Sequence, residues 1–271
     1  MPTTDIDAMA AEAFGLLGTG RQTSPFSSRF QDLTLDAAYR VSRKVRGLRE
    51  GRGEMPVGRK IGFTNRTIWA EYQVFAPIWG PMYDRTVHAL RDVATGFSVG
   101  HLSEPRIKPE IAFHFMAAPE PGLTERELFG CIDWIAHGFE LVQSIFPGWK
   151  FTAADTVAAY ALHGAYLIGP RYQVSDQRET WFRALSDFEI ELHRNGELAA
   201  RGHAWDVLDG PLSAIRHLND LLADDPESPR LAAGEVVTTG TLTAALPVRA
   251  GDSWRTVLRG IDIDGIAATT I

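Results

Sequence analysis

The sequence contains one cysteine and no long apolar run, and each scarcity excludes a class of protein. Cys131 alone cannot form an intrachain disulfide, which excludes a disulfide-stabilised secreted scaffold and favours the reducing cytoplasm. No stretch approaches roughly 18 uninterrupted apolar residues, so no membrane-spanning helix is expected. The N-terminal residues place acids before their apolar stretch and lack a basic segment, so they do not resemble a signal peptide. We therefore expect a cytoplasmic protein without a membrane partner.

Basic charge is also scarce. The chain has 27 Lys and Arg against 34 Asp and Glu, and its formal net charge is −7. A general nucleic-acid binder needs a basic face, so this class is excluded. The glycine-rich nucleotide-binding motifs, the HExxH and CxxC metal or redox motifs and the GxSxG hydrolase motif are all missing. The 8 histidines are scattered, without the close pair that is typical of a zinc site.

What remains is an ordinary globular composition with many turn residues. Hydrophobic residues make up 45% of the 271 positions and charged residues 23%, which excludes a mainly disordered chain. A chain of this length can bury its own core without disulfides or a structural metal. The 25 glycines and 15 prolines follow no collagen-like period, so they indicate a fold rich in turns and loops.

Hydrophobic periodicity divides the chain into a helical start and a mixed body. Apolar residues at helical spacing predict a helix that Gly18 ends, and a second helix that begins after Thr34 and ends near Gly51. Further helices are predicted over 124–136, which opens with a capping box, and over 212–222. Strand-like segments cover 57–63, 107–115, 138–145, 164–168, 188–194, 235–241 and 257–263. We predict a helical N-terminal segment, residues 1–55, and an α+β domain, residues 56–271.

Three charged residues stand in apolar, strand-like surroundings. Lys60 lies between Gly58 and Gly62, which share its strand face and leave room for another group to approach. Glu110 and Glu140 each interrupt an apolar run. One such residue is usually solvent-exposed, but two carboxylates in apolar strands favour a paired or metal-binding site, because buried charges need partners.

The order of several short segments resembles one family. These segments are Lys60-Ile61-Gly62, Pro109–Phe113, Phe139–Val142, Asp155–Ala158, Gly210-Pro211-Leu212 and Val237–Thr241. Together they resemble the 2-keto-4-pentenoate hydratase / 4-oxalocrotonate decarboxylase branch of the fumarylacetoacetate hydrolase superfamily, from about residue 21 to the C-terminus. The resemblance implies a rolled, mixed β-sheet around one active site, a small 2-oxo acid substrate and a homo-oligomer.

The resemblance also implies a divalent metal, Mg²⁺ or Mn²⁺, held by a Glu-x-Glu pair and a later Glu. Glu110 matches the second Glu of the pair, Glu140 the third ligand, and Lys60 a lysine that lies over the substrate. The first Glu is Lys108 here, on the same strand face as Glu110. An ammonium about 4 Å from a divalent cation repels it by roughly 8 kcal/mol at an effective dielectric constant near 20. We therefore predict no tightly bound metal, with weak binding by Glu110 and Glu140 as the alternative.

Two other segments depart from the family pattern. The acid that hydratases carry in Pro-Asp-Phe-Gly is replaced by Ile78, whereas decarboxylases often have an aliphatic residue there. The family's Asp-Asn-x-Ser is replaced by residues 159–162, followed by His163. Tyr160 and His163 are candidates for proton transfer, since either side chain can donate or accept. The alternative for His163 is simple packing beside Gly164.

These observations give one set of candidate residues and one leading function. The catalytic candidates are Lys60, Lys108, Glu110, Glu140 and His163, and the substrate-binding candidates are Gly62, Ile78, Tyr160, Leu162, His203 and Thr241. The resemblance implies a hydratase that adds water to a 2-hydroxy-2,4-dienoate from the meta-cleavage of aromatic compounds. The alternatives are a decarboxylase of a 2-oxo-enedioate, a hydrolase that cleaves a C–C bond of an acylpyruvate, and a non-catalytic homologue.

Overall fold

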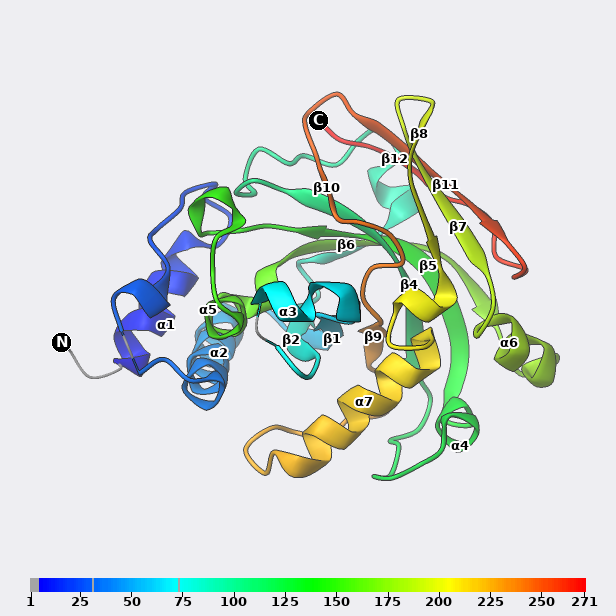
Figure 1. The fold of residues 1–271 in the computed structure, drawn as a ribbon, viewed down its shortest axis with the longest axis horizontal. Helices are drawn as coiled ribbons and strands as arrows, with labels where there is room; N and C mark the ends of the chain where they lie inside the picture. Colours follow the sequence, from blue (N-terminus) through cyan, green and yellow to red (C-terminus); the bar gives the residue numbers. More distant parts are fainter. Residues whose placement is uncertain (1–4, 31, 73) are drawn as a thin grey trace.

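The computed structural model describes residues 5–30, 32–72 and 74–271, and one large sheet organises them (Figure 1). Its strand order is β2-β1-β9-β4-β5-β6-β3, with β10 paired to β4. Its strands are β1 (Pro56–Gly62), β2 (Ile78–Tyr83), β3 (Val87–Ala89), β4 (Arg106–Phe115), β5 (Ile132–Val142), β6 (His163–Gln173), β9 (Val236–Thr238) and β10 (Leu246–Pro247). The pairs β1·β9 and β3·β6 are parallel and the others antiparallel, so the sheet is mixed.

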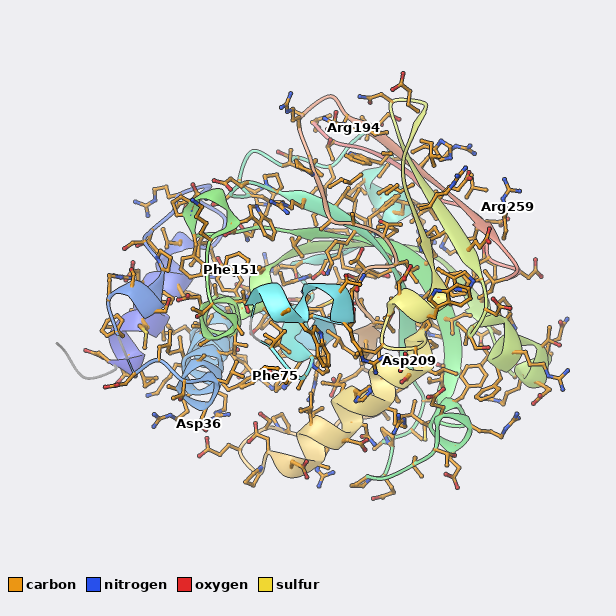
Figure 2. The ribbon with its side chains drawn as sticks, in the orientation of Figure 1. Asp36, Phe75, Phe151, Arg194, Asp209 and Arg259 are labelled. Carbon is orange, nitrogen blue, oxygen red and sulfur yellow. The ribbon has the colours of Figure 1, made fainter. Side chains whose placement is uncertain are left out.

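A second, antiparallel sheet packs against the middle of the first. It consists of β7 (Glu189–Arg194), β8 (Glu197–His203), β11 (Ser253–Arg259) and β12 (Ala267–Thr269), in the order β12-β11-β7-β8. Arg194 and Arg259, labelled in Figure 2, mark opposite ends of this sheet. Phe139 and Leu141 of the large sheet share a buried cluster with Leu192 and Trp254 of the small one. This contact covers the face of β5 that lies away from the site described below.

Helices cover the remaining surfaces of the large sheet (Figure 1). They are α1 (Ile6–Leu16), α2 (Leu35–Gly51), α3 (Trp69–Tyr72), α4 (Glu125–Phe129), α5 (Ala153–Ala158), α6 (Arg178–Ala184) and α7 (Pro211–Asp224). Short 3₁₀ turns lie at Phe26–Ser28, Arg66–Ile68, Leu90–Val93, Pro147–Trp149, Tyr160–Leu162 and Ala204–Asp206. Within the described ranges, every helix is too short or too polar to span a bilayer.

The N-terminal helices join the sheet through a common core. Met9 of α1 and Val41 of α2 pack in one buried cluster with Val157 of α5 and Ile78 of β2. Asp5 and Thr34 cap α1 and α2 by accepting bonds from backbone N–H groups near each helix start. The α+β fold with a rolled, mixed sheet and a helical N-terminal part is confirmed.

One helix prediction is wrong over most of its length. The capping box at Thr124 is present, but α4 ends at Phe129 and β5 begins at Ile132, where a helix was predicted through residue 136. β5 bonds to β4 on one edge and to β6 on the other. A strand buried on both faces has no alternating pattern, so its apolar residues look like a continuation of the helix before it.

Candidate active site

Four charged side chains meet where β1, β4 and β5 lie near one another. Lys108 of β4 stands directly opposite Glu140 of β5 in the antiparallel register. Glu110 lies two residues further along β4 and therefore points to the same face as Lys108. Lys60 reaches the group from β1, which joins β4 through β9. All four are buried, and Glu110 and Glu140 are fully so.

Lys108 lies between the two carboxylates. Its Nζ is 2.7 Å from Glu110 Oε1 and 2.7 Å from Glu140 Oε2. The other oxygen of Glu110 accepts the backbone N–H of Gly240 at 3.1 Å. Lys60 Nζ is 3.2 Å from Glu140 Oε1 and donates to the carbonyl of Ala161 at 3.0 Å. Two ammonium groups thus balance two carboxylates, and the formal charge of the cluster is zero.

Burial and pairing act differently on the four groups. Burial raises the pKa of Glu110 to about 7, against the opposing effect of Lys108. Burial would also raise the pKa of Glu140, but Lys108 and Lys60 outweigh burial and hold that pKa well below its usual range. Burial lowers the pKa of Lys60, whereas the two carboxylates outweigh burial at Lys108 and raise its pKa. Glu110 is therefore the member best suited to exchange protons near neutral pH.

His163 extends this cluster by one more group. Its Nδ1 lies 3.0 Å from Glu140 Oε1, and its Nε2 lies 3.0 Å from Thr86 Oγ1. Burial lowers the pKa of His163, so the neutral ring is favoured. A neutral ring that donates from Nδ1 to the carboxylate accepts at Nε2 from the threonine hydroxyl. His163 thus hydrogen-bonds to the cluster, which is more than packing beside Gly164.

A cavity of about 360 Å³ opens onto the two lysines. Four of the predicted substrate-binding residues line it, namely Gly62, Ile78, Leu162 and Thr241. Tyr160 is buried next to the cavity, where it begins a run of three residues with left-handed backbone, φ 48°, 53° and 61° at residues 160–162. This run directs the carbonyl of Ala161 toward Lys60. It also passes so close to β2 that a Cβ at Gly80 would lie 2.7 Å from Ala161 Cβ.

The cavity also contains residues that sequence reasoning missed. Arg106 lines it together with Trp149 and Phe151, and the Arg106 guanidinium lies 4.1 Å from the centre of the Trp149 ring. Arg106 is on the strand face of Lys108 and Glu110, and this parity is the signal that could have identified it. No carboxylate pairs with Arg106 among the residues that the structure describes, so its charge is available to an anion.

His203 lies outside this cavity. It ends β8 of the small sheet, where its Nε2 is 3.1 Å from Asp187 Oδ1 and its ring stacks on Trp205. It lines a separate cavity together with Glu191 and Arg201. The structure therefore does not bring His203 together with the other predicted site residues.

The donor set does not fit a divalent metal. Across the described part of the chain, no group of three or more His, Cys, Asp or Glu side chains is arranged to hold a metal ion. The position between Glu110 and Glu140, where a cation would bridge the carboxylates, is filled by the Lys108 ammonium. Mg²⁺ requires several oxygen ligands in near-octahedral geometry, and an ammonium offers it none.

Comparisons with known proteins identify the fold and the family. The model of the fumarylacetoacetate (FAA) hydrolase C-terminal family matches residues 109–268. A 2-hydroxyhexa-2,4-dienoate hydratase from Comamonas testosteroni is 28% identical over 97% of both chains. A 4-oxalocrotonate decarboxylase from Pseudomonas putida is 30% identical over 83% of this chain and 81% of its own.

Solved structures agree with these sequence relatives. The 4-oxalocrotonate decarboxylase from Pseudomonas putida G7, complexed with magnesium and adipate, superposes with a TM-score of 0.88 at 26% identity. That match covers 98% of this chain and 97% of the other. With both kinds of comparison in agreement, the chain belongs to the fumarylacetoacetate hydrolase family, in its 2-keto-4-pentenoate hydratase / 4-oxalocrotonate decarboxylase branch.

Proposed function

We propose that this protein is a lyase that adds water to a 2-hydroxy-2,4-dienoate, the hydratase reaction of aromatic meta-cleavage catabolism. The observation that carries the proposal is the buried cluster of Lys60, Lys108, Glu110 and Glu140, whose two lysines line a cavity of about 360 Å³. The relatives that match this chain over nearly its whole length include a 2-hydroxyhexa-2,4-dienoate hydratase and a 2-keto-4-pentenoate hydratase. The substrate is a small, conjugated 2-oxo or 2-hydroxy acid.

The reaction needs stabilisation of a negative charge on the oxygen at C2. The hydroxydienoate gains a proton at C5 and loses one from its hydroxyl, water adds at C4, and a second protonation at C3 restores the 2-oxo group. The net change is the addition of one water molecule. An ammonium carries three N–H groups. Lys60 donates one to the Ala161 carbonyl and forms an ion pair with Glu140, whereas Lys108 donates one to Glu140 and forms an ion pair with Glu110. The third N–H of each lysine is available to the substrate oxygen or carboxylate.

Proton transfer at carbon falls to the one cluster member whose pKa lies near neutrality. Glu110, with its pKa raised to about 7, gives and takes protons at the substrate carbon atoms. Lys60, with its lowered pKa, assists at the C2 oxygen. His163 hydrogen-bonds to the Glu140 carboxylate through Nδ1. It thereby fixes the carboxylate that orients both lysines.

Lys108 distinguishes this protein from relatives whose structures contain divalent metals, such as the decarboxylase with magnesium. We propose that its ammonium takes the place of the cation and that catalysis needs no tightly bound metal. A lysine is a weaker electrophile than Mg²⁺, so a second ammonium, that of Lys60, shares the charge of the enolate.

The decisive experiment combines metal analysis with a spectrophotometric assay. The purified protein should hydrate a 2-hydroxydienoate, with loss of the dienol absorbance, and EDTA should leave this rate unchanged. Lys108→Glu restores three carboxylates and should add Mg²⁺-dependent thermal stabilisation that the wild type lacks. Stoichiometric Mg²⁺ or Mn²⁺ in the wild type, with activity lost to EDTA and restored by metal, would overturn the metal-free proposal.

A decarboxylase is the second candidate, and Ile78 favours it. This residue is buried in β2 and lines the cavity at the position where the family's hydratases carry an acid. Release of CO₂ from a 2-oxo-enedioate, without hydration of the dienoate, would assign this activity. Clean hydrolysis of an acylpyruvate would instead identify a hydrolase, and inactivity on all three substrates would identify a non-catalytic homologue. The homo-oligomeric state stays a prediction, which light scattering would test.

A further inference from the structure

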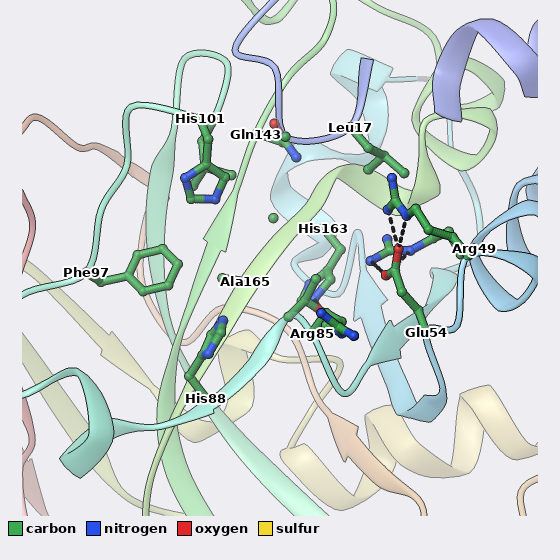
Figure 3. A pocket seen from close by; sticks show the side chains of 15 residues that line it. Leu17, Arg49, Glu54, Arg85, His88, Phe97, His101, Gln143, His163 and Ala165 are labelled. Atoms are coloured by element: carbon green, nitrogen blue, oxygen red, sulfur yellow. Dashed lines mark hydrogen bonds and ion pairs between the residues drawn. The ribbon is translucent and has the colours of Figure 1, made fainter. Parts of the chain in front are cut away.

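A second cavity, of about 330 Å³, lies on the Nε2 side of His163 (Figure 3). Thr86 and His163 contribute to its lining, and it shares no lining residue with the active-site cavity. His163 connects this cavity to the charged cluster, because Glu140 is bonded to one ring nitrogen and Thr86 to the other. Apart from His163, the reaction proposed above uses no residue of this second cavity.

One part of this cavity is rich in arginine. Arg49 and Arg52 both bind Glu54, with Arg49 Nε 2.8 Å from Oε2 and Arg52 Nε 2.7 Å from Oε1. Arg85 also lines the cavity and has no hydrogen-bond or ion-pair partner among the described residues. Three guanidinium groups and one carboxylate give this lining a formal charge of +2. An arginine fork binds carboxylates well, so the excess charge favours an anion.

The opposite part of the cavity is aromatic. His88 and Phe97 have ring centroids 5.4 Å apart, and Phe97 and His101 have centroids 5.9 Å apart. Figure 3 shows these three rings across the cavity from Arg49 and Glu54. Burial lowers the pKa of both His88 and His101, so neutral rings are favoured there. A row of three flat rings suits a planar ligand, which gains area and offset or edge contacts with each ring.

We propose that this cavity binds a planar aromatic carboxylate. The ring of the ligand packs against the row of His88, Phe97 and His101, and its carboxylate faces Arg85 and the outer N–H groups of the other two arginines. The volume of about 330 Å³ lies at the small end of ligand cavities and fits a single substituted ring. The bound ligand lies next to Thr86, which is hydrogen-bonded through His163 to the catalytic cluster.

Calorimetric titration of the full chain tests the proposal with benzoate as the probe. Benzoate should bind saturably, whereas benzamide, which lacks the charge, and cyclohexanecarboxylate, which lacks the planar ring, should bind at least roughly tenfold more weakly. Arg85→Gln should weaken benzoate binding by roughly tenfold, because it removes the unpaired cation. Arg91→Gln is the matched control, since Arg91 is exposed and lies outside the cavity lining.

Each other outcome counts against the proposal. Benzoate binding that survives Arg85→Gln but is lost in Arg106→Gln would place the ligand in the active-site cavity. If cyclohexanecarboxylate or inorganic phosphate binds as tightly as benzoate, the cavity does not select a planar aromatic carboxylate, and the proposed ligand class is wrong. Failure of benzoate to bind would overturn the site altogether. Binding is measured without turnover, so a failed hydratase assay leaves this result unaffected.

Discussion

His163 lines one cavity and hydrogen-bonds to the charged cluster beside another, and both cavities are lined by cationic side chains. In the active-site cavity the cations of the cluster are lysines, each paired with a buried carboxylate, and the cluster is neutral. In the second cavity the cations are three arginines, and the one carboxylate, that of Glu54, pairs with only two of them, Arg49 and Arg52. In the neutral cluster, pairing offsets the desolvation cost of burial, and the lysines offer directed N–H donors to a charge that develops during reaction. The arginine-rich lining instead favours an anion that is charged before it binds.

Removal of one charge from the neutral cluster should have the largest effect. Glu140→Gln leaves Lys60 and Lys108 buried side by side with only Glu110 to balance them. We expect loss of at least roughly 100-fold in kcat and roughly 3–5 kcal/mol of unfolding free energy. Steady-state assays and denaturant titration measure both. Glu191→Gln, at a partly exposed pair with Arg201, is the control and should cost no more than about 1 kcal/mol.

A buried histidine beneath the active site should make stability depend on pH. His137 is fully buried, with Nδ1 at the carbonyl of Glu110 and Nε2 at Thr256 Oγ1. Burial lowers its pKa from 6.5 to about 4. Between these values a proton binds the unfolded chain but not the folded one, so the unfolding free energy falls by roughly 3 kcal/mol as pH decreases from 6.5 to 4. Above pH 6.5 this contribution is constant.

Denaturant titrations at pH 7 and pH 5 check this expectation, with His137→Gln as the comparison. Between pH 7 and pH 5 the unfolding free energy of the variant should decrease less than that of the wild type, by the amount that His137 contributes. An equally steep decrease in both proteins would assign the effect to other groups. His88 and His101 of the second cavity are partly accessible to water, so they should accept protons at less cost in stability.

Arg106 lines the active-site cavity and pairs with no carboxylate among the described residues, so it should act mainly on substrate binding. Arg106→Gln removes the guanidinium that lies on Trp149 but leaves the neutral cluster intact. We expect KM to rise roughly tenfold with kcat little changed, because one charge-assisted contact to the substrate carboxylate is lost. Initial-rate kinetics over a range of substrate concentrations test this. An equal decrease in kcat would show that Arg106 acts on the transition state instead.

Removal of the hydrogen bond between Thr86 and His163 should have the smallest effect. Thr86→Val removes the hydroxyl bonded to His163 Nε2 and keeps the shape of the side chain. Loss of the bond to His163 corresponds to roughly 1 kcal/mol, so kcat should fall about fivefold, and loss of the bonds to the Tyr83 backbone should lower stability in addition. Thr86→Ser keeps the hydroxyl and should retain the wild-type rate. Equal rates for all three proteins would show that the ring of His163 needs no support from this side.

The active-site cluster could be predicted because strand alternation acts over short distances in the sequence. Lys60, Glu110 and Glu140 are charged residues in apolar strand-like runs, and Lys108 shares a face with Glu110 by parity. The family resemblance indicated that these residues belong to one site. The bonds of His163 to Glu140 and Thr86 depend on how β6 aligns with β5 and β3, which no local pattern encodes. The second cavity could not be found in the sequence, because it combines α2, β3 and the loops near Arg85 and His101. Its residues are far apart in the sequence and are brought together only by the tertiary fold.

The left-handed run at residues 160–162 has a consequence for how this active site tolerates sequence change. Lys60 is oriented by a main-chain carbonyl, that of Ala161, and no substitution of a side chain can delete a carbonyl. Three consecutive residues with Cβ atoms hold a conformation that disfavours such residues, so the surrounding core must maintain it. The position of the lysine is thus protected against point changes at the turn itself but depends on packing around it. Variants that loosen α5 or crowd Gly80 should therefore impair catalysis without touching a charged group.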